Sequence, residues 1–326
     1  MNRLIVTRKR RALNLPLISV QASSTQNKRG TLGLLGVCFR SPRWRTASDT
    51  FEFLIVVLAH RRPAFVCDTL QALKHYTDPC RTLVVVAVNH ASQRRPLLKA
   101  VADELGPDFV YPDDLPLGWG AGLWALLLRT IRWARTRFRF RNVVKMDYDT
   151  LVIKPGLEDA LSQHVGPRVG IVADEWHVNA GVRVRRQEHT DFQWFRKALG
   201  WDLTAVDWTV GNAGALFAIT PAFLSRIDED GQMERVEEII GHLGTYDDQY
   251  PHLLCQHYGL DIGALTDDPR FSPHWQDSVE SVLSHAEKEV IAFHPTKVWP
   301  GTHDQEQERV RAFYREIRLK ETYRRI

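Results

Sequence analysis

Continuous apolar runs mark the predicted strands of a folded body that begins near Phe51. Residues 53–58 (FLIVVL) and 83–88 (LVVVAV) are uninterrupted and rich in β-branched side chains. Such runs are typical of parallel strands buried on both faces. Apolar residues at three- and four-residue spacing between the two runs indicate a helix over about 65–76. The order predicts a βαβ unit, with ligand-binding groups at the carboxyl ends of its strands.

The rest of the pattern extends this unit into one α/β domain. We expect a mixed, mostly parallel central sheet flanked by helices. Further helices are expected over residues 123 to about 133, around Leu253 and Leu254, and from Glu306 to the end. Further strands, some mixed with loops, are expected at 143–146, 169–173, 178–182, 211–219 and 290–293. The last helix is so highly charged that we expect it on the outside of the domain.

Charge separates the N-terminal leader from this domain. Residues 1–50 hold ten Lys and Arg against a single acid, Asp49, so the leader carries +9. The chain as a whole carries +4, which leaves −5 for the remainder. The leader is predicted to be a disordered, dispensable tail, although a transit-like segment or a nucleic-acid or membrane-surface arm has the same composition.

Cysteine usage and hydropathy bear on location. The four cysteines are scattered without a C-x-x-C pair, which argues against a zinc site or a disulfide framework and suits a reducing cytosol. No apolar run approaches the roughly 20 residues of a membrane helix. A cytoplasmic protein, or one peripheral at a membrane, is therefore expected.

Asp147 and Asp149 follow the apolar strand at 143–146. Side chains at i and i+2 of a strand lie on the same face, so two carboxylates here could share a hard cation, Mn²⁺ or Mg²⁺. Such an ion would bridge a diphosphate and act as a Lewis acid. The alternative is a capping or turn role. A second D-x-D, from Asp228 to Asp230, lies in a charged segment before Gly231 and is predicted to be a solvated turn.

The order of motifs resembles the nucleotide-binding half of GT-A glycosyltransferases. The resemblance is carried by the first strand with His60-Arg-Arg-Pro63, the second strand, Gly118–Gly122 with its helix, and Lys145-Met-Asp-Tyr-Asp149. It covers about residues 53–300. It implies a Rossmann-like GT-A domain over 51–300, with a donor half at about 51–155 and an acceptor half at about 156–300, followed by a C-terminal helix over 301–326.

The resemblance also implies partners and binding residues. The donor would be a UDP- or GDP-sugar, and the transferred sugar would most simply be a hexose. The acceptor would be a carbohydrate, a lipid-linked molecule or a protein. Asn89 stands where many family-2 members have Asp, but an amide can still bond a ribose or base. The residues expected to contact the nucleotide-sugar in this half are Ala59, His60, Arg62, Asn89, Gly118, Lys145 and Tyr148.

Two interpretations compete downstream. Thr245-Tyr-Asp247-Asp248 resembles the acidic pair of inverting family-2 enzymes, which would make Asp248 the general base. Alternatively, Asn179-Ala-Gly181, Asp248-Gln249 and His294-Pro-Thr-Lys297-Val-Trp299 resemble retaining family-8 enzymes. His294 would then be a third metal ligand and Lys297 would hold the diphosphate. The late motif lacks the family's glycine, and Val298 replaces its usual proline.

Structural explanations exist for the same residues. Asp247 and Asp248 could cap the helix that contains Leu253, and a lone His294 could be a structural hydrogen-bonding residue. Trp208 could stack on a sugar, and Asn212, like Asp247, could border the acceptor. A packed strand with tight glycines explains the segment around Asn212 equally well.

Other classes of function fit less well. A nucleic-acid-binding protein would use the basic leader, but the positive charge lies outside the folded part and no strand pair interleaves aromatic and basic residues. A nucleotidyltransferase-like enzyme shares the metal–carboxylate chemistry. It usually has an early Gly-rich phosphate loop, and residues 59–63 contain no glycine. The sequence therefore favours metal-dependent sugar transfer, with no obligate nucleic acid.

Overall fold

The computed structural model describes residues 50–89, 94–106, 109–112, 121–177, 200, 210–231, 233–235, 250–265, 267–272, 278–294 and 304–325. The basic leader, apart from Thr50, lies outside this part of the chain, and so does the segment 178–182 that was expected to contain a short strand.

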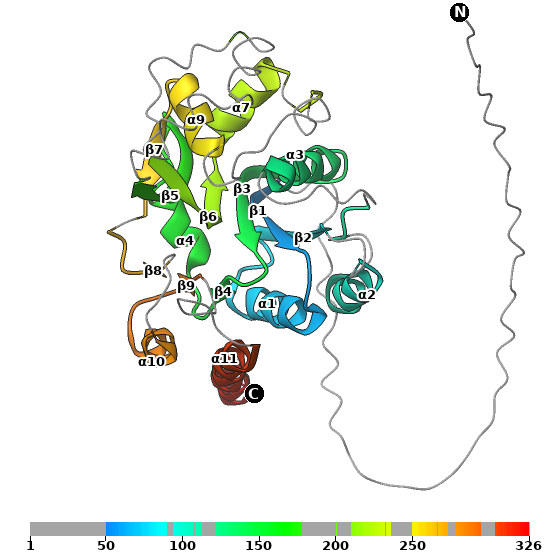
Figure 1. The fold of residues 1–326 in the computed structure, drawn as a ribbon, viewed down its shortest axis with the longest axis vertical. Coiled ribbons are helices and arrows are strands. Elements are labelled where there is room, and N and C mark those ends of the chain that lie inside the picture. Colours follow the sequence, from blue (N-terminus) through cyan, green and yellow to red (C-terminus); the bar gives the residue numbers. More distant parts are fainter. Residues whose placement is uncertain are drawn as a thin grey trace, which may run out of the picture. The chain divides into compact units, whose positions relative to one another are not determined.

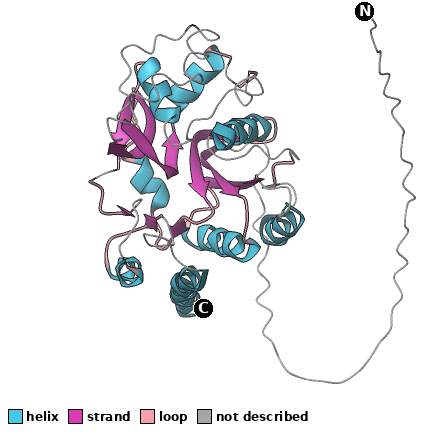
Figure 2. Cartoon of the chain, viewed as in Figure 1, coloured by secondary structure: helices cyan, strands magenta, loops and turns pink. Residues whose placement is uncertain are grey.

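A six-stranded mixed sheet forms the centre of the domain, with the strand order β2-β1-β3-β6-β5-β7. Strand β1 is parallel to both β2 and β3, β6 is antiparallel to β3 and β5, and β7 is parallel to β5. Figure 2 shows these strands in magenta, with helices around them. The strands are Thr50–Ala59 (β1), Thr82–Val88 (β2), Arg139–Asp147 (β3), Val169–His177 (β5), Val210–Ile219 (β6) and Asp261–Ala264 (β7). The expected fold class is confirmed.

Helices cover both faces of the first three strands. Figure 1 places α3 on one side of β1, β2 and β3, and α1 and α2 on the other side, with α11 beside α1. The helices are Pro63–Tyr76 (α1), Arg94–Leu105 (α2), Ala121–Arg135 (α3), Leu157–Ser162 (α4), Pro221–Glu229 (α7), Tyr250–His257 (α9), Val279–Leu283 (α10) and Asp304–Arg325 (α11), with a 3₁₀ helix, Ser284–Glu287 (η3). This double covering explains why β1 and β2 are almost continuously apolar, since neither face meets water.

A second, three-stranded sheet joins distant parts of the chain, in the order β4-β9-β8. Its short strands are Leu151–Val152 (β4), Phe271–Ser272 (β8) and Ala292–Phe293 (β9). Strand β4 comes just after the D-x-D motif and pairs antiparallel with β9, which directly precedes His294. This pairing brings the late histidine to the D-x-D motif across more than a hundred residues of chain.

The charged C-terminal helix α11 packs against α1 through one face, and most of its other side chains are partly or fully exposed. One face of α11 is buried, including Arg311 at 0% exposure and Arg318 at 6%. Arg311 and Arg318 both pair with Asp68 of α1. These charged side chains can be buried because each is paired with an opposite charge. Helix α2 was not predicted, since only three of its twelve residues are buried.

None of the described helices is long and apolar enough to cross a membrane.

One buried histidine predicts a pH dependence of stability. His285 is 3% exposed, and neither ring nitrogen has a hydrogen-bond partner among the described residues. Burial, then Lys288 and Lys154, lower its pKa from 6.5 to about 4. Above pH 6.5 the ring is neutral in both states and contributes nothing. Below it only the unfolded chain takes up the proton, so stability falls by about 3 kcal/mol as the pH reaches 4.

The comparison is between the wild type and His285→Phe, whose ring can keep the contact with Phe293. Urea unfolding of both at pH 7 and pH 4 should show a larger loss for the wild type by about that amount. An equal loss in the two proteins would contradict the assignment.

Candidate metal centre

A cavity of about 170 Å³ opens at the carboxyl ends of β1, β2 and β3. Because the three strands are parallel, their carboxyl ends meet at one edge of the sheet, where ligand sites of open α/β sheets are expected. The described residues that line the cavity are Leu58, Ala59, His60, Arg61, Asn89, Leu123, Asp147, Tyr148, Asp149 and His294. Seven residues predicted for the site from the sequence are therefore brought together here: Ala59, His60, Asn89, Asp147, Tyr148, Asp149 and His294.

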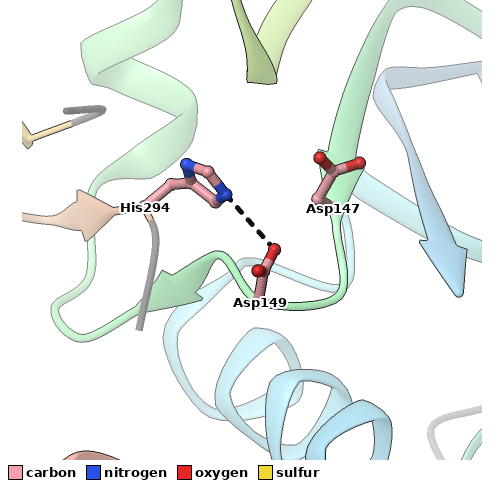
Figure 3. Close-up of side chains that lie close together, drawn as sticks. All are labelled: Asp147, Asp149 and His294. Atoms are coloured by element: carbon pink, nitrogen blue, oxygen red, sulfur yellow. Dashed lines mark ion pairs between the residues drawn. The ribbon is translucent and has the colours of Figure 1, made fainter. Parts of the chain in front are cut away.

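Asp147, Asp149 and His294 form a cluster with the donors of a metal site. One ligand atom from each lies within 4.8 Å of the others, and His294 Nε2 is 3.2 Å from Asp149 Oδ1. In Figure 3, the Asp149 carboxylate and the His294 ring point toward one another, and Asp147 lies across from them at the end of β3. Asp149 is 5% exposed, so its charge is largely withdrawn from water. An acid at this depth requires compensation by a cation or by hydrogen bonds.

The two carboxylates converge for a different reason from the one predicted. Strand β3 ends at Asp147, and Asp149 belongs to a turn that is closed by a 3.0 Å hydrogen bond from Thr150 N to Asp147 O. The expectation that both carboxylates share one face of a strand is therefore wrong. Strand alternation instead places Lys145 and Asp147 on one face, and Lys145 Nζ is 2.7 Å from Asp147 Oδ1.

Lys145 lies behind Asp147 and outside the lining of the cavity. It is 1% exposed and stands 5.9 Å from the ring centroid of Phe217, on the neighbouring strand β6. A buried ammonium is strongly stabilised by a paired carboxylate. The side chain that was expected to contact the nucleotide forms an ion pair with Asp147 in the structure.

Tyr148, between the two acids, is held by the loop that follows β1. Its ring packs edge-on against His60, with centroids 4.7 Å apart, and Arg61 Nε donates a 3.2 Å hydrogen bond to its hydroxyl. Its backbone N–H donates to Leu58 O at 3.2 Å. Arg61 was not singled out from the sequence. It is an exposed cation on the rim of the cavity and is suited to an anionic ligand.

Arg62 points elsewhere because of its backbone. It caps α1 in the left-handed region, with φ of 58°, before Pro63. Its guanidinium donates a 2.9 Å hydrogen bond to Gln307 of α11, and it is not among the residues that line the cavity. A non-glycine residue in this region costs roughly 1–3 kcal/mol and often marks a functional loop. With this backbone conformation, the consecutive residues Arg61 and Arg62 have different partners, Tyr148 and Gln307.

Asn89 follows the last residue of β2, and its N–H donates to Ala59 O at 2.8 Å. Its side chain is largely buried at the edge of the cavity. This bond keeps the ends of β1 and β2 together, so an amide and the backbone of the first loop face one space. Both are groups that can bond a ribose or base.

Several residues predicted for the site cannot be placed. Those outside the described residues are Gly118, Trp208, Asp247, Asp248 and Lys297. Asn212 lies in β6 opposite Glu175, but its side chain is outside the described set. The second D-x-D ends helix α7 rather than forming only a solvated turn: Asp228 pairs with Arg135, and Asp230 accepts a hydrogen bond from Tyr258. It is not part of the metal cluster.

The cluster fits a divalent cation by its size and its donors. Donor atoms on opposite sides of an ion of Mg²⁺ to Ca²⁺ size are about 4–5 Å apart, which agrees with the 4.8 Å limit here. Two carboxylates and an imidazole are a mixed oxygen and nitrogen set of the kind that binds divalent metal ions.

Comparisons with known proteins give matches only among solved structures. No family model matches the sequence, and no curated protein matches it significantly. A galactosyltransferase, LgtC, solved with donor and acceptor sugar analogues, is 14% identical with a TM-score of 0.41, over 81% of this chain and 95% of that chain. The bifunctional glycosyltransferase WbbM is 11% identical with a TM-score of 0.40, over 80% of this chain and 50% of that chain.

Mouse xyloside xylosyltransferase 1, in its apo form, is also 11% identical, with a TM-score of 0.39, over 75% of this chain and 97% of that chain. At these identities and scores, the likeness concerns the fold alone.

Proposed function

We propose that this protein is a metal-dependent glycosyltransferase that moves a sugar from a nucleotide-sugar to a hydroxyl acceptor. The observation that carries the proposal is the cluster of Asp147, Asp149 and His294 in a cavity at the carboxyl ends of three parallel strands. The order of motifs that resembles GT-A glycosyltransferases also supports it, because that order is a property of the sequence along the whole domain and not of this cluster alone.

Each group in the cavity has a role in this proposal. Asp147, Asp149 and His294 hold a divalent cation, Mn²⁺ or Mg²⁺, which when bound neutralises charge on the departing nucleoside diphosphate. Arg61 supplies a second positive charge at the rim of the cavity. Asn89, Ala59 and His60 border the nucleoside. Lys145 orients the Asp147 carboxylate from behind, through the 2.7 Å ion pair between them.

The acceptor side is proposed from the sequence. Asp248 removes the proton of the acceptor hydroxyl in the inverting interpretation, and Asp247, Trp208 and Asn212 border the acceptor. The position of His294, 3.2 Å from Asp149, favours the alternative, a retaining family-8-like enzyme with Lys297 at the diphosphate. NMR of the anomeric proton in the first-formed product distinguishes the inverting from the retaining mechanism. A product with the same anomeric configuration as the donor sugar indicates retention, and the opposite configuration indicates inversion.

A thermal-shift screen of nucleotide-sugars tests the proposed function. A ligand that binds only the folded state at a hundred times its Kd stabilises it by about 2.7 kcal/mol. For a domain of this size, that raises the melting temperature by about 5 °C or more. We expect such a shift for at least one UDP- or GDP-sugar with Mn²⁺ present, and its loss when EDTA removes the metal.

The same sugar without its nucleotide is the matched control and should produce no shift. If no nucleotide-sugar alters the melting temperature with or without Mn²⁺, the proposal is wrong. A shift produced by an oligonucleotide instead would favour the nucleic-acid-binding alternative.

A further inference from the structure

The turn that carries Asp149 is held by buried side chains from two helices. The backbone carbonyl of Tyr148 accepts two hydrogen bonds, from Thr69 Oγ1 of α1 at 2.7 Å and from Arg311 Nη2 of α11 at 2.9 Å. Thr69 and Arg311 are both 0% exposed, and neither is among the described residues that line the cavity. The turn is therefore supported by groups that have no direct access to a ligand.

The carbonyl of Tyr148 determines where Asp149 lies. It belongs to the peptide unit that joins Tyr148 to Asp149, and the planarity of that unit places the Asp149 nitrogen and Cα in the same plane. Two donors that fix the oxygen therefore also fix the Asp149 backbone. A neutral hydroxyl and a charged guanidinium share the task, and the charged donor makes the stronger bond.

Arg311 is held in place by its own partners. Its Nη1 lies 3.0 Å from Asp68 Oδ2, 3.1 Å from Phe65 O and 3.2 Å from Thr69 Oγ1. Its guanidinium carbon is also 4.8 Å from the ring centroid of Phe65. Burial lowers the pKa of Arg311, while the charges of Asp68 and Asp149 act in the opposite direction. The carboxylate of Asp68, 3.0 Å away, compensates the buried positive charge.

Helix α11 also reaches the other loop that borders the cavity. Gln307, one helical turn before Arg311 and on the same face, accepts the 2.9 Å hydrogen bond from Arg62 in the loop after β1. One helix thus contacts both the loop that contributes Ala59, His60 and Arg61 to the cavity and the turn that contributes Asp149. Figure 1 shows α11 directly beside α1, the helix that follows the first of these loops.

We propose that Arg311 is a positioning residue for the metal centre: through the Tyr148 carbonyl, with Thr69, it holds the Asp149 carboxylate in its binding position, so that metal affinity depends on the C-terminal helix. This inference rests on the proposed function, because it takes Asp147, Asp149 and His294 as the metal ligands.

Arg318 provides a matched control within the same ion-pair network. It lies on the same face of α11 and donates to Asp68 Oδ1 at 2.8 Å, yet no hydrogen bond joins it to the turn among the contacts of the described residues. Either Arg311→Met or Arg318→Met removes one buried positive charge. In both variants Asp68 keeps two other arginines, since Arg315 Nε also lies 3.3 Å from it. Both variants should therefore fold with a lowered melting temperature.

Titration of the full-length chain with Mn²⁺ alone, read by electron paramagnetic resonance of the free ion, separates the two roles. We expect Arg311→Met to weaken Mn²⁺ binding by about tenfold or more, in the range seen when supports of metal ligands are removed. Arg318→Met should stay within about twofold of the wild type, although its melting temperature also falls. Arg311→Lys, which keeps the charge, should lie between the two.

If Arg311→Met does not fold, substitutions of Thr69, the other donor to the Tyr148 carbonyl, allow the same Mn²⁺ titration. Thr69→Val keeps the shape but removes the hydroxyl, so Mn²⁺ binding should weaken, and Thr69→Ser should restore it. If Arg311→Met binds Mn²⁺ as tightly as the wild type, the proposal is overturned. If Arg311→Met does not fold, wild-type Mn²⁺ affinity in Thr69→Val overturns it. Equal weakening in Arg311→Met and Arg318→Met would overturn it as well.

Wild type and Asp149→Asn, titrated alongside, separate this inference from the proposed function. If the wild type binds no Mn²⁺, or Asp149→Asn binds it as the wild type does, the metal centre is wrong and the positioning role falls with it. If Asp149→Asn loses binding while Arg311→Met keeps it, only the positioning role is wrong.

Discussion

Replacing Asp149 with asparagine is expected to lower metal-dependent sugar transfer and nucleotide-sugar hydrolysis by about a thousandfold, which corresponds to about 4 kcal/mol of lost transition-state stabilisation. Asparagine keeps the shape of the side chain and removes its charge. The buried carboxylate is the proposed ligand that faces His294, at 3.2 Å, so its charge would act most directly on a cation bound there. The fold should be unaffected, because the turn is closed and supported by backbone groups of residues 147–150.

The measurement is turnover of the nucleotide-sugar identified by the thermal-shift screen, with Mn²⁺ and after chelation. Asp228→Asn is the matched control, because it removes one acid from the other D-x-D of this chain, where Asp228 is exposed and pairs with Arg135. That variant should retain full activity. Full activity in Asp149→Asn, or wild-type activity that a chelator leaves untouched, would contradict the metal assignment.

Replacing Asp68 with alanine is expected to destabilise the fold by about 3–5 kcal/mol. Asp68 is 2% exposed and balances the buried guanidinium groups of Arg311 and Arg318. Without it, two buried positive charges face each other with no carboxylate between them, and an uncompensated buried charge is among the largest single destabilising effects. Urea unfolding monitored by circular dichroism measures the difference in free energy.

Asp159→Ala is the control for the Asp68 substitution. Asp159 Oδ1 makes an even shorter contact, 2.6 Å to Arg81 Nη1, but its side chain is 69% exposed. Exposed ion pairs contribute at most about 1 kcal/mol, so its loss should be small. Comparable destabilisation by the two substitutions would show that burial does not govern the strength of the network around Asp68.

Much of the fold could be predicted because it depends on local patterns. The apolar runs at 53–58 and 83–88 lie within β1 and β2, and the periodic segment at 65–76 lies within α1. The carboxyl ends of these strands were the expected place for a site, and Ala59, Asn89 and Asp147 do line one cavity. These predictions hold because strand burial and chain order largely determine how a βαβ unit assembles.

Two side chains predicted to contact the nucleotide-sugar have other partners in the structure, one nearby and one distant in sequence. Lys145 was expected at the nucleotide, but strand alternation directs it to Asp147. Arg62 was expected to contact the nucleotide-sugar, but from its left-handed backbone it donates a hydrogen bond to Gln307, 245 residues later, and it is not among the described residues that line the cavity. Strand alternation indicates the first partner, which is only two residues away, whereas the second is defined only when α11 has packed against α1.

The sequence by itself determined the available side chains: two acids at the end of an apolar strand, predicted to bind a divalent cation, and a late histidine as a candidate third ligand. Only the tertiary structure decided how they meet. A turn brings Asp149 beside Asp147, and pairing of β4 with β9 brings in His294. A buried arginine of the last helix holds the turn. The physical reason is that residue type and local spacing set the available chemistry, whereas sheet pairing and buried charge networks set distances between segments far apart in the chain.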